Sequence, residues 1–142
     1  MSIYLRPADS NDMMILYKWA NDETVRKNSF NTSAIDINSH KNWFLNKLKD
    51  ENTIFYIIMK ENKSVGQLRI DINENIGIIN YSIDKDYRGQ KIGSVALKII
   101  KNDIKNITLI GKVKKENSSS ICAFRNANYR EFEYEEYIKF IS

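Results

Sequence analysis

Two kinds of apolar pattern alternate along the chain, and each predicts one type of secondary structure. In some segments apolar residues recur at the spacing of an α-helix, most regularly around 93–106, where lysines occupy the opposite face. Asn38 or Ser39 is placed to cap the second of these helices, and Asn117 or Ser118 is placed to cap the last. The expected helices span residues 13–20, 39–49, 93–106 and 118–127.

Between the helical segments lie runs rich in isoleucine, valine and aromatic residues, which favour strands. Pro7 is expected to end the first run, because proline has no amide hydrogen to donate to a sheet. The polar segment 21–38 is expected to be a loop with room for a short helix. The expected strands span residues 3–6, 53–60, 65–72, 76–83 and 107–113, with one or two more within 129–141.

The order of these elements predicts the fold class. Three consecutive strands joined by short turns form antiparallel hairpins, whereas the strand–helix–strand unit that follows them indicates a parallel pairing. The chain is therefore expected to be α/β with a mixed sheet and flanking helices. A doubly wound nucleotide-binding fold is disfavoured, because it would alternate strands and helices from the start. No repeat or linker divides the chain, so residues 1–142 are expected to form one domain.

Composition narrows the class of protein further. Of 142 residues, 42% are hydrophobic and 11% aromatic, which is enough for a sizeable core and excludes a disordered tail. The single cysteine and single histidine, Cys122 and His40, exclude an internal disulfide and leave too few ligands for a zinc site, so no metal is expected. No apolar run approaches the ~20 residues of a membrane span, and the N-terminus opens directly into a strand. A cytoplasmic protein without a membrane partner is expected.

The segment most indicative of ligand binding is Tyr87–Ser94, between an expected strand and the most regular helix. Amides at a helix N-terminus lack partners and carry partial positive charge, so they bind phosphate groups. Arg88 and Lys91 would add full charges, and the net charge of +4 favours anionic ligands without implying nucleic acid. A plain strand–helix connection explains the glycines equally well, and neither the dinucleotide fingerprint nor the P-loop pattern is present.

Several motifs together resemble the GCN5-related N-acetyltransferase (GNAT) superfamily over nearly the whole chain. The segment Arg88–Gly93 looks like its acyl-CoA pyrophosphate loop, Gln/Arg-x-x-Gly-x-Gly/Ala. The other matching residues are Leu5-Arg6-Pro7-Ala8, Asn80-Tyr81-Ser82-Ile83, Asn117, Ser120, Phe124 and Asn128-Tyr129. The resemblance implies acetyl-CoA as cosubstrate, bound where two parallel strands splay apart, and a primary amine as the acceptor. It implies cofactor contacts from Ser82, Ile83, Arg88, Gly89, Gln90, Lys91, Ile92, Gly93, Ser94 and Asn117.

Four positions depart from the family pattern. Lys91 stands where glycine is usual, which is tolerable if its φ stays negative, and Asn128 replaces a glycine at a position where asparagine tolerates the left-handed conformation. Phe124 occupies the position of the tyrosine that usually protonates the leaving thiolate. Ile78 occupies the position of the usual glutamate base.

Proton transfer must then involve other groups. The candidates are His40 as a base and Tyr81 as an acid, each also compatible with a packing role. A covalent acetyl-cysteine at Cys122 is disfavoured, because no histidine accompanies it in the sequence.

The early segments resemble a subgroup that acetylates nucleotide-linked amino sugars of the pseudaminic acid type. The residues concerned are Asn21–Arg26 and Ser39–Phe44. Arg26 could pair with a diphosphate and Trp43 could stack on uracil or sugar, with His40 beside them, although core packing of Trp43 is the simpler alternative. The expected acceptor is a UDP-linked 4-amino-dideoxy sugar. Protein N-terminal or small-amine acetylation, a catalytically impaired acyl-CoA-binding module and a homodimer are alternatives left open.

Overall fold

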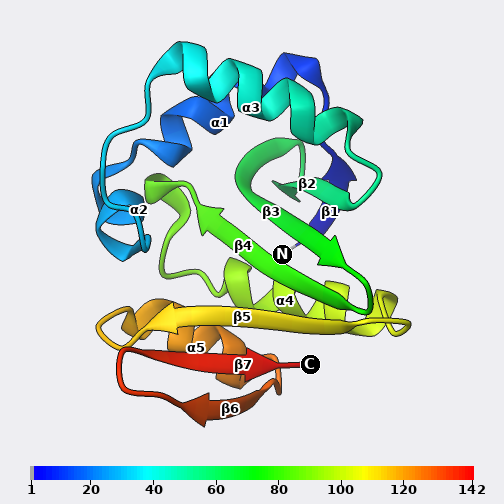
Figure 1. Ribbon diagram of the computed structural model, residues 1–142, viewed down its shortest axis with the longest axis vertical. Helices are drawn as coiled ribbons and strands as arrows, with labels where there is room; N and C mark the ends of the chain where they lie inside the picture. The colour runs from blue at the N-terminus through cyan, green and yellow to red at the C-terminus, as the bar shows by residue number, and fades with distance from the viewer. Residues whose placement is uncertain (1) are drawn as a thin grey trace.

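In the computed structural model, which describes residues 2–142, all strands belong to one seven-stranded sheet (Figure 1). The order across the sheet is β1-β2-β3-β4-β5-β7-β6, and β4–β5 is its parallel pair. The expected mixed sheet with flanking helices is therefore confirmed. The strands are β1 (Ile3–Pro7), β2 (Thr53–Lys60), β3 (Lys63–Asn73), β4 (Ile76–Ile83), β5 (Thr108–Lys114), β6 (Arg130–Glu133) and β7 (Tyr137–Ile141).

Two groups of helices cover opposite faces of this sheet. α1 and α3 pack on one face of β2 through a small apolar cluster, while α4 and α5 cover the other face of the sheet and enclose the larger core. The face that carries α1 and α3 stays open over β5, β7 and β6 (Figure 1). The helices are η1 (Ser10–Asp12), α1 (Met13–Ala20), α2 (Glu23–Asn28), α3 (Ile37–Lys49), η2 (Lys85–Tyr87), α4 (Ile92–Asp103) and α5 (Ser118–Asn126).

The differences from the expected elements lie at their ends. Asp36, rather than Asn38 or Ser39, caps α3, because its carboxylate accepts the amide hydrogen of Ser39 at 3.1 Å. Pro7 is still part of β1, which an edge strand tolerates since its outer amides need no partner. α4 ends at Asp103, three residues before its expected end.

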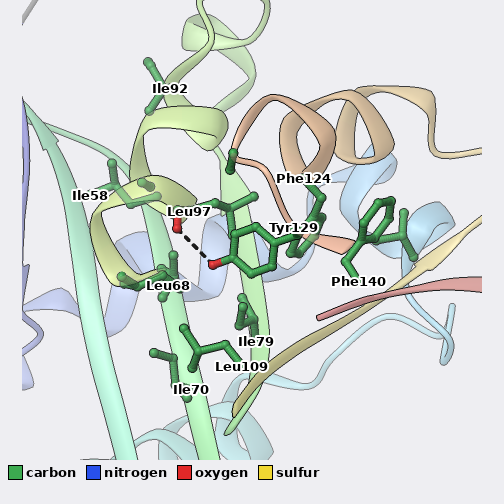
Figure 2. Close-up of a cluster of buried hydrophobic side chains, with 14 of the residues drawn as sticks. Ile58, Leu68, Ile70, Ile79, Ile92, Leu97, Leu109, Phe124, Tyr129 and Phe140 are labelled. Carbon is green, nitrogen blue, oxygen red and sulfur yellow. Dashed lines mark hydrogen bonds between the residues drawn. The ribbon is translucent and has the colours of Figure 1, made fainter. Parts of the chain in front are cut away.

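The larger core is built around an aromatic cluster between α5 and β7 (Figure 2). The ring of Phe124, 2% exposed, stacks on Phe140 with centroids 4.8 Å apart and meets Tyr129 edge-on at 5.1 Å. The buried hydroxyl of Tyr129 donates to the carbonyl oxygen of Leu97 at 2.9 Å, so α4 and the chain after α5 are joined through the core. Phe124 is therefore a central packing residue.

β4 and β5 pair over only three residue pairs and then separate. The register partners are Ile76–Thr108, Gly77–Leu109 and Ile78–Ile110. Beyond them β4 continues to Ile83 and remains paired with β3, and Figure 1 shows β4 and β5 diverging toward the end where α2 lies. The expected splayed parallel pair is confirmed. Backbone groups on the open edge of β4 thus have no strand partner beyond Ile78.

Aromatic side chains occupy the space where the two strands separate. Phe124 lies directly on Gly111 of β5, and it meets Tyr81 of β4 edge-on, with ring centroids 5.9 Å apart. A Cβ atom added at Gly111 would lie 2.3 Å from Cζ of Phe124. Glycine is therefore needed at this position for close approach of the ring rather than for an unusual backbone angle.

The substitution Gly111→Ala is expected to lower the free energy of unfolding by about 1–3 kcal/mol, because it overpacks the contact with Phe124. The companion substitution Phe124→Leu removes the ring atoms concerned, so Gly111→Ala should cost much less in that background. Urea unfolding of the four proteins, analysed as a double-mutant cycle, measures the coupling. If the losses in free energy of unfolding are additive, the Phe124 ring does not pack tightly against β5 at Gly111.

Candidate active site

The connection from η2 to α4 carries the expected phosphate-binding motif. Gly89 has φ +80 with no atom within 4 Å of an added Cβ, so it serves the turn and leaves open space beside it. Lys91 has φ +63, which overturns the expectation that this lysine keeps a negative φ. The sharp entry into α4 imposes the left-handed conformation, which costs a non-glycine residue roughly 1–2 kcal/mol. Asn128 also adopts φ +63, as expected.

The first turn of α4 opens onto this loop without a side-chain cap. Lys91 is the N-cap residue and makes no capping hydrogen bond, so the amides of Ile92, Gly93 and Ser94 remain available to a ligand. Nearby, Nζ of Lys60 donates to Oε1 of Gln90 at 2.6 Å, which brings a further cation to the loop from β2. Amides, helix dipole and cations together favour a bound phosphate group.

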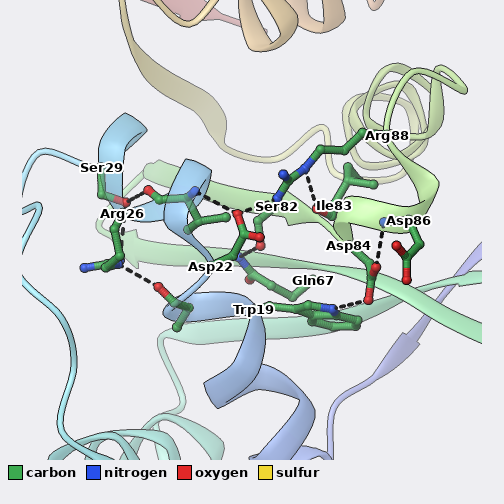
Figure 3. Close-up of polar contacts among 12 residues, drawn as sticks. Trp19, Asp22, Arg26, Ser29, Gln67, Ser82, Ile83, Asp84, Asp86 and Arg88 are labelled. Atoms are coloured by element: carbon green, nitrogen blue, oxygen red, sulfur yellow. Dashed lines mark hydrogen bonds and ion pairs between the residues drawn. The ribbon is translucent and has the colours of Figure 1, made fainter.

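Arg88 connects this loop to the other side of the molecule (Figure 3). Its Nε donates to the carbonyl oxygen of Ile83 at 3.1 Å, and its Nη2 donates to Oδ2 of Asp22 at 2.8 Å. The same carboxylate caps α2 by accepting from the Val25 amide. Although partial burial opposes ionisation, the hydrogen bonds from Arg88 and Val25 hold the pKa of Asp22 below its ordinary value.

A second contact joins α1 to the end of β4. The indole nitrogen of Trp19, a buried residue, donates to Oδ2 of Asp84 at 2.8 Å, as Figure 3 also shows. Partial burial would raise the pKa of Asp84, but the bonds from Trp19 and from the Asp86 amide outweigh it and lower that pKa. The helices on the open face are therefore anchored on both sides of the β4 terminus.

Tyr81 lies on the α4–α5 side of β4, beside the N-termini of both helices. Its hydroxyl and Oγ of Ser120 are 2.9 Å apart, and an added Cβ at Gly93 would come within 2.9 Å of its ring. Burial raises the pKa of Tyr81 to about 12, partly offset by the Ser120 hydrogen bond, so the phenol is protonated at neutral pH. The position combines core packing with access to the two helix N-termini.

Asn117 caps α5, as expected, with Oδ1 accepting from the Ser120 amide at 3.3 Å. Cys122 is exposed on the same helix. Among residues 2–142, no group of three or more His, Cys, Asp and Glu side chains is arranged to hold a metal ion. Within the same residues no helix has the length and apolarity needed to cross a membrane.

His40 is placed inside the cluster formed by α1, α3 and β2. Its side chain is 3% exposed, its Nε2 lies 3.3 Å from the carbonyl oxygen of Met13, and its ring packs beside Tyr17 and stacks over Phe44. Burial lowers its pKa, against a smaller opposite effect of the Met13 hydrogen bond, so the imidazole is neutral. The structure thus places His40 among packing residues and does not bring it to the splay.

Arg26 organises the segment between α2 and α3. Its Nε donates to the carbonyl oxygen of Ala20 at 2.6 Å, its Nη1 to those of Asn31 and Ser33, and its Nη2 to Oγ of Ser29 at 3.3 Å. Each nitrogen of the guanidinium thereby has a partner within residues 20–33. These contacts shape the chain that borders the open face, and they leave little capacity to pair with a diphosphate.

Trp43 is half-buried beneath an arginine of the sheet. The guanidinium carbon of Arg69 lies 4.8 Å from the Trp43 ring centroid, and Arg69 also pairs with Asp71, which in turn pairs with Lys47 of α3. One face of the indole is therefore already occupied by a cation.

A patch that sequence reasoning missed lies on the open face of β5 and β7. Lys112 of β5 is the register partner of Lys139 of β7, and Nζ of Lys112 lies 5.6 Å from the ring centroid of Tyr137. Phe30, from the segment before α3, meets Tyr137 edge-on with ring centroids 6.4 Å apart, and Nζ of Lys114 lies 5.9 Å from the centroid of the Phe30 ring. The alternation of Lys112 and Lys114 was visible in the sequence, but it favoured a solvated strand face. The lysine–aromatic patch is hereafter defined as Phe30, Lys112, Lys114, Tyr137 and Lys139.

Residues 2–130 match the sequence model of one protein family, the acetyltransferase (GNAT) domain. No curated protein sequence matches the chain significantly. Structural similarity is extensive at low sequence identity. The aminoglycoside acetyltransferase AAC(6')-Ib with coenzyme A and kanamycin has a TM-score of 0.85 at 12% identity, covering 99% of this chain and 94% of that one.

Two other solved structures share the fold. The ribosomal alpha-N-protein acetyltransferase RimL in complex with coenzyme A gives a TM-score of 0.85 at 15% identity, over 100% of this chain and 94% of that chain. The spermidine N-acetyltransferase from Vibrio cholerae, in complex with coenzyme A and spermine, gives a TM-score of 0.83 at 12% identity, over 98% of this chain and 93% of that chain. The family match, together with the splayed strands and the loop before α4, leads to one conclusion: the chain belongs to the GNAT acetyltransferase family and is an N-acetyltransferase that uses acetyl-CoA.

Proposed function

We propose that the acceptor is an anionic primary amine, a UDP-linked 4-amino-dideoxy sugar, acetylated at its amine by acetyl-CoA. The observation that carries this proposal is the pair of facing lysines, Lys112 and Lys139, on the open side of the sheet. Lys112 follows soon after Ile110, the last residue of β5 that pairs with β4, and Lys139 faces Lys112 from β7. A ligand that enters the splay from the open face would therefore meet them.

The open face of the sheet carries a clear excess of positive charge. Strand alternation and register place Arg69, Lys112, Lys114, Lys139 and Arg130 on this face. Among residues 2–142, the β3–β7 strands add one acidic side chain to the face, and that residue, Asp71, already pairs with Arg69 and Lys47. Like charges directly opposite each other in an antiparallel pair are destabilising. A bound anion between Lys112 and Lys139 would remove that repulsion.

The exposed aromatic ring of Phe30 fits the nucleoside part of the ligand. Phe30 is 61% exposed although it is large and apolar, and it lies beside Tyr137 and Lys114. A flat ring next to cations suits a nucleobase that continues into a diphosphate. We therefore assign nucleotide binding to the lysine–aromatic patch rather than to Arg26 and Trp43, whose polar and aromatic surfaces are engaged within the protein.

The same charges disfavour polycationic acceptors. Kanamycin and spermine, the amines named with two of the solved relatives, carry several positive charges at neutral pH. A face with unpaired lysines would repel them and so select against them. Peptide N-termini remain a second class to be tested in the same assay.

On the cofactor side, acetyl-CoA would be held by the loop before α4 and by β4. The amides of Ile92, Gly93 and Ser94, with Arg88, Lys91, Gly89 and Gln90 around them, suit the pyrophosphate. Ile83 presents its backbone amide on the open edge of β4, where it suits the thioester carbonyl, whereas the carbonyl oxygen of Ser82 points toward Gly66 of β3. A backbone amide at the Ile83 position would donate a hydrogen bond to the oxyanion that forms when the neutral amine attacks the thioester. Asn117 caps α5 beside Ser120, which contacts Tyr81 of β4.

The direct test is thiol release from acetyl-CoA with a UDP-4-amino-4,6-dideoxy sugar, followed by the mass of the product. We expect turnover with the gain of one acetyl group, a KM for the sugar nucleotide that rises with salt, and no turnover of spermidine or kanamycin. Turnover of those polycations, or of a peptide N-terminus in preference to the sugar nucleotide, would contradict the proposal.

A matched set of lysine variants then locates the nucleotide. Lys112→Gln and Lys139→Gln should each raise KM for the sugar nucleotide about 2- to 5-fold, because an exposed charge pair contributes up to about 1 kcal/mol. Lys98→Gln, at an exposed lysine of α4, is the control and should change nothing. Equal effects at all three positions would indicate a general charge effect rather than a site.

Asp22 should compete with the CoA pyrophosphate for Arg88. Asp22→Asn removes the competing charge but keeps the α2 cap, so acetyl-CoA should bind about 2- to 5-fold more tightly by isothermal titration. Arg88→Gln should weaken binding about 5- to 10-fold. Asp86→Asn removes an exposed charge in the same segment without touching Arg88, and serves as the control. An Asp22→Asn protein with wild-type affinity would place the pyrophosphate away from Arg88.

A further inference from the structure

One buried polar side-chain atom on β3, the strand beside β4, has no partner. Gln67 of β3 is 9% exposed, and its Nε2 donates to Oδ1 of Asn80 at 3.0 Å and to Oγ of Ser82 at 3.2 Å. Its Oε1 accepts no hydrogen bond, and it is the one buried side-chain nitrogen or oxygen without a partner among residues 2–142. A buried acceptor left unpaired costs about 1–3 kcal/mol, so its retention indicates a donor that the protein alone does not supply.

The location of Gln67 indicates which donor this is. Gln67 is the register partner of Ser82, the β4 residue next to Ile83 at the end of the strand's open edge. Alternation places the side chains of Gln67, Asn80 and Ser82 on the open face, the side from which the acceptor would approach. Figure 3 shows Gln67 beside Ser82 in the region beneath the end of β4. The free oxygen therefore belongs to a side chain on the strand next to β4, and the end of β4 is proposed to hold the thioester.

We propose that Oε1 of Gln67 accepts a hydrogen bond from the attacking amine of the acceptor and so fixes its lone pair toward the thioester carbon. The nitrogen lone pair forms the C–N bond, the C–S bond breaks, and sulfur leaves with the electron pair as the CoA thiolate. The proton released from nitrogen passes to solvent and the thiolate takes up one proton, which gives acetamide and CoA thiol. A carboxamide is too weak a base to remove that proton, so Gln67 orients the amine and does not deprotonate it.

The neighbouring residues support this role. Asn80 and Ser82 both bind Nε2 and hold the carboxamide with its oxygen turned away from them. The open-face residue that precedes Asn80 on β4 is Ile78, 39% exposed, which offers no polar group. His40, the other buried candidate, is enclosed by α1 and α3. The carboxamide oxygen of Gln67 cannot remove a proton from an ammonium group as a carboxylate could, so turnover should follow the ionisation of the amine itself.

The test compares Gln67→Leu with Gln67→Glu, using two acceptors: the sugar nucleotide and ethylamine at high concentration. The inference rests on N-acetyl transfer but not on the sugar nucleotide, since the contact is to an N–H that both amines share. Gln67→Leu should lower kcat/KM about 10- to 100-fold for both amines, with the Kd for acetyl-CoA unchanged. Gln67→Glu should retain turnover and move the acid limb of the kcat/KM pH profile to lower pH, because a carboxylate can also remove the proton.

Several outcomes would overturn the inference. Wild-type rates in Gln67→Leu would show that Oε1 binds only water. An equal loss of acetyl-CoA affinity in Gln67→Leu would show that the site has collapsed locally. A wild-type pH profile in Gln67→Glu would show that this position does not contact the amine. Turnover of neither amine by the wild-type protein would also overturn it. Turnover of ethylamine but not of the sugar nucleotide would reject the proposed acceptor and still test Gln67. If Gln67→Leu does not fold, the pH profile of Gln67→Glu decides alone.

Discussion

The early separation of β4 from β5 is the constraint on which the rest of the structure depends. A parallel pair that continued past Ile78 and Ile110 would satisfy the backbone of both strands and close the site. Instead the rings of Phe124 and Tyr81 occupy the space behind the opening, and Gly111 lets Phe124 lie directly on β5. Phe124, which the family resemblance aligned with the usual tyrosine acid, is thus a central part of the packing at the point where the strands separate.

Two sets of contacts connect the opposite sides of this opening. Asp22 pairs with Arg88 of the loop before α4, and Trp19 binds Asp84 at the end of β4. Through them, α1 and α2 are attached to the end of β4 and to the loop before α4. Binding of one substrate can therefore influence the other through Arg88, since its guanidinium has one partner on each side.

Local signals in the sequence predicted most of the elements and the loop before α4, because helix periodicity and short glycine motifs act over a few residues. These local signals gave wrong predictions for one helix cap and for the backbone conformation of one loop residue. Asp36 takes the cap expected of Asn38 or Ser39, and Lys91 accepts a left-handed conformation that the sequence did not suggest. The enclosed His40 could not be distinguished from an accessible base, since burial depends on how α1, α3 and β2 pack.

By itself, the amino-acid sequence determined the mixed sheet and the position of the loop before α4, and its resemblance to the GNAT family implied the splayed pair. Tertiary structure alone decided which side chains meet at the site. Lys112 faces Lys139 because β5 and β7 pair across 27 residues of chain, and Gln67 keeps a free oxygen because Asn80 and Ser82 both turn to its nitrogen. Such long-range pairings leave no mark in local composition or periodicity, so the site had to be found in three dimensions.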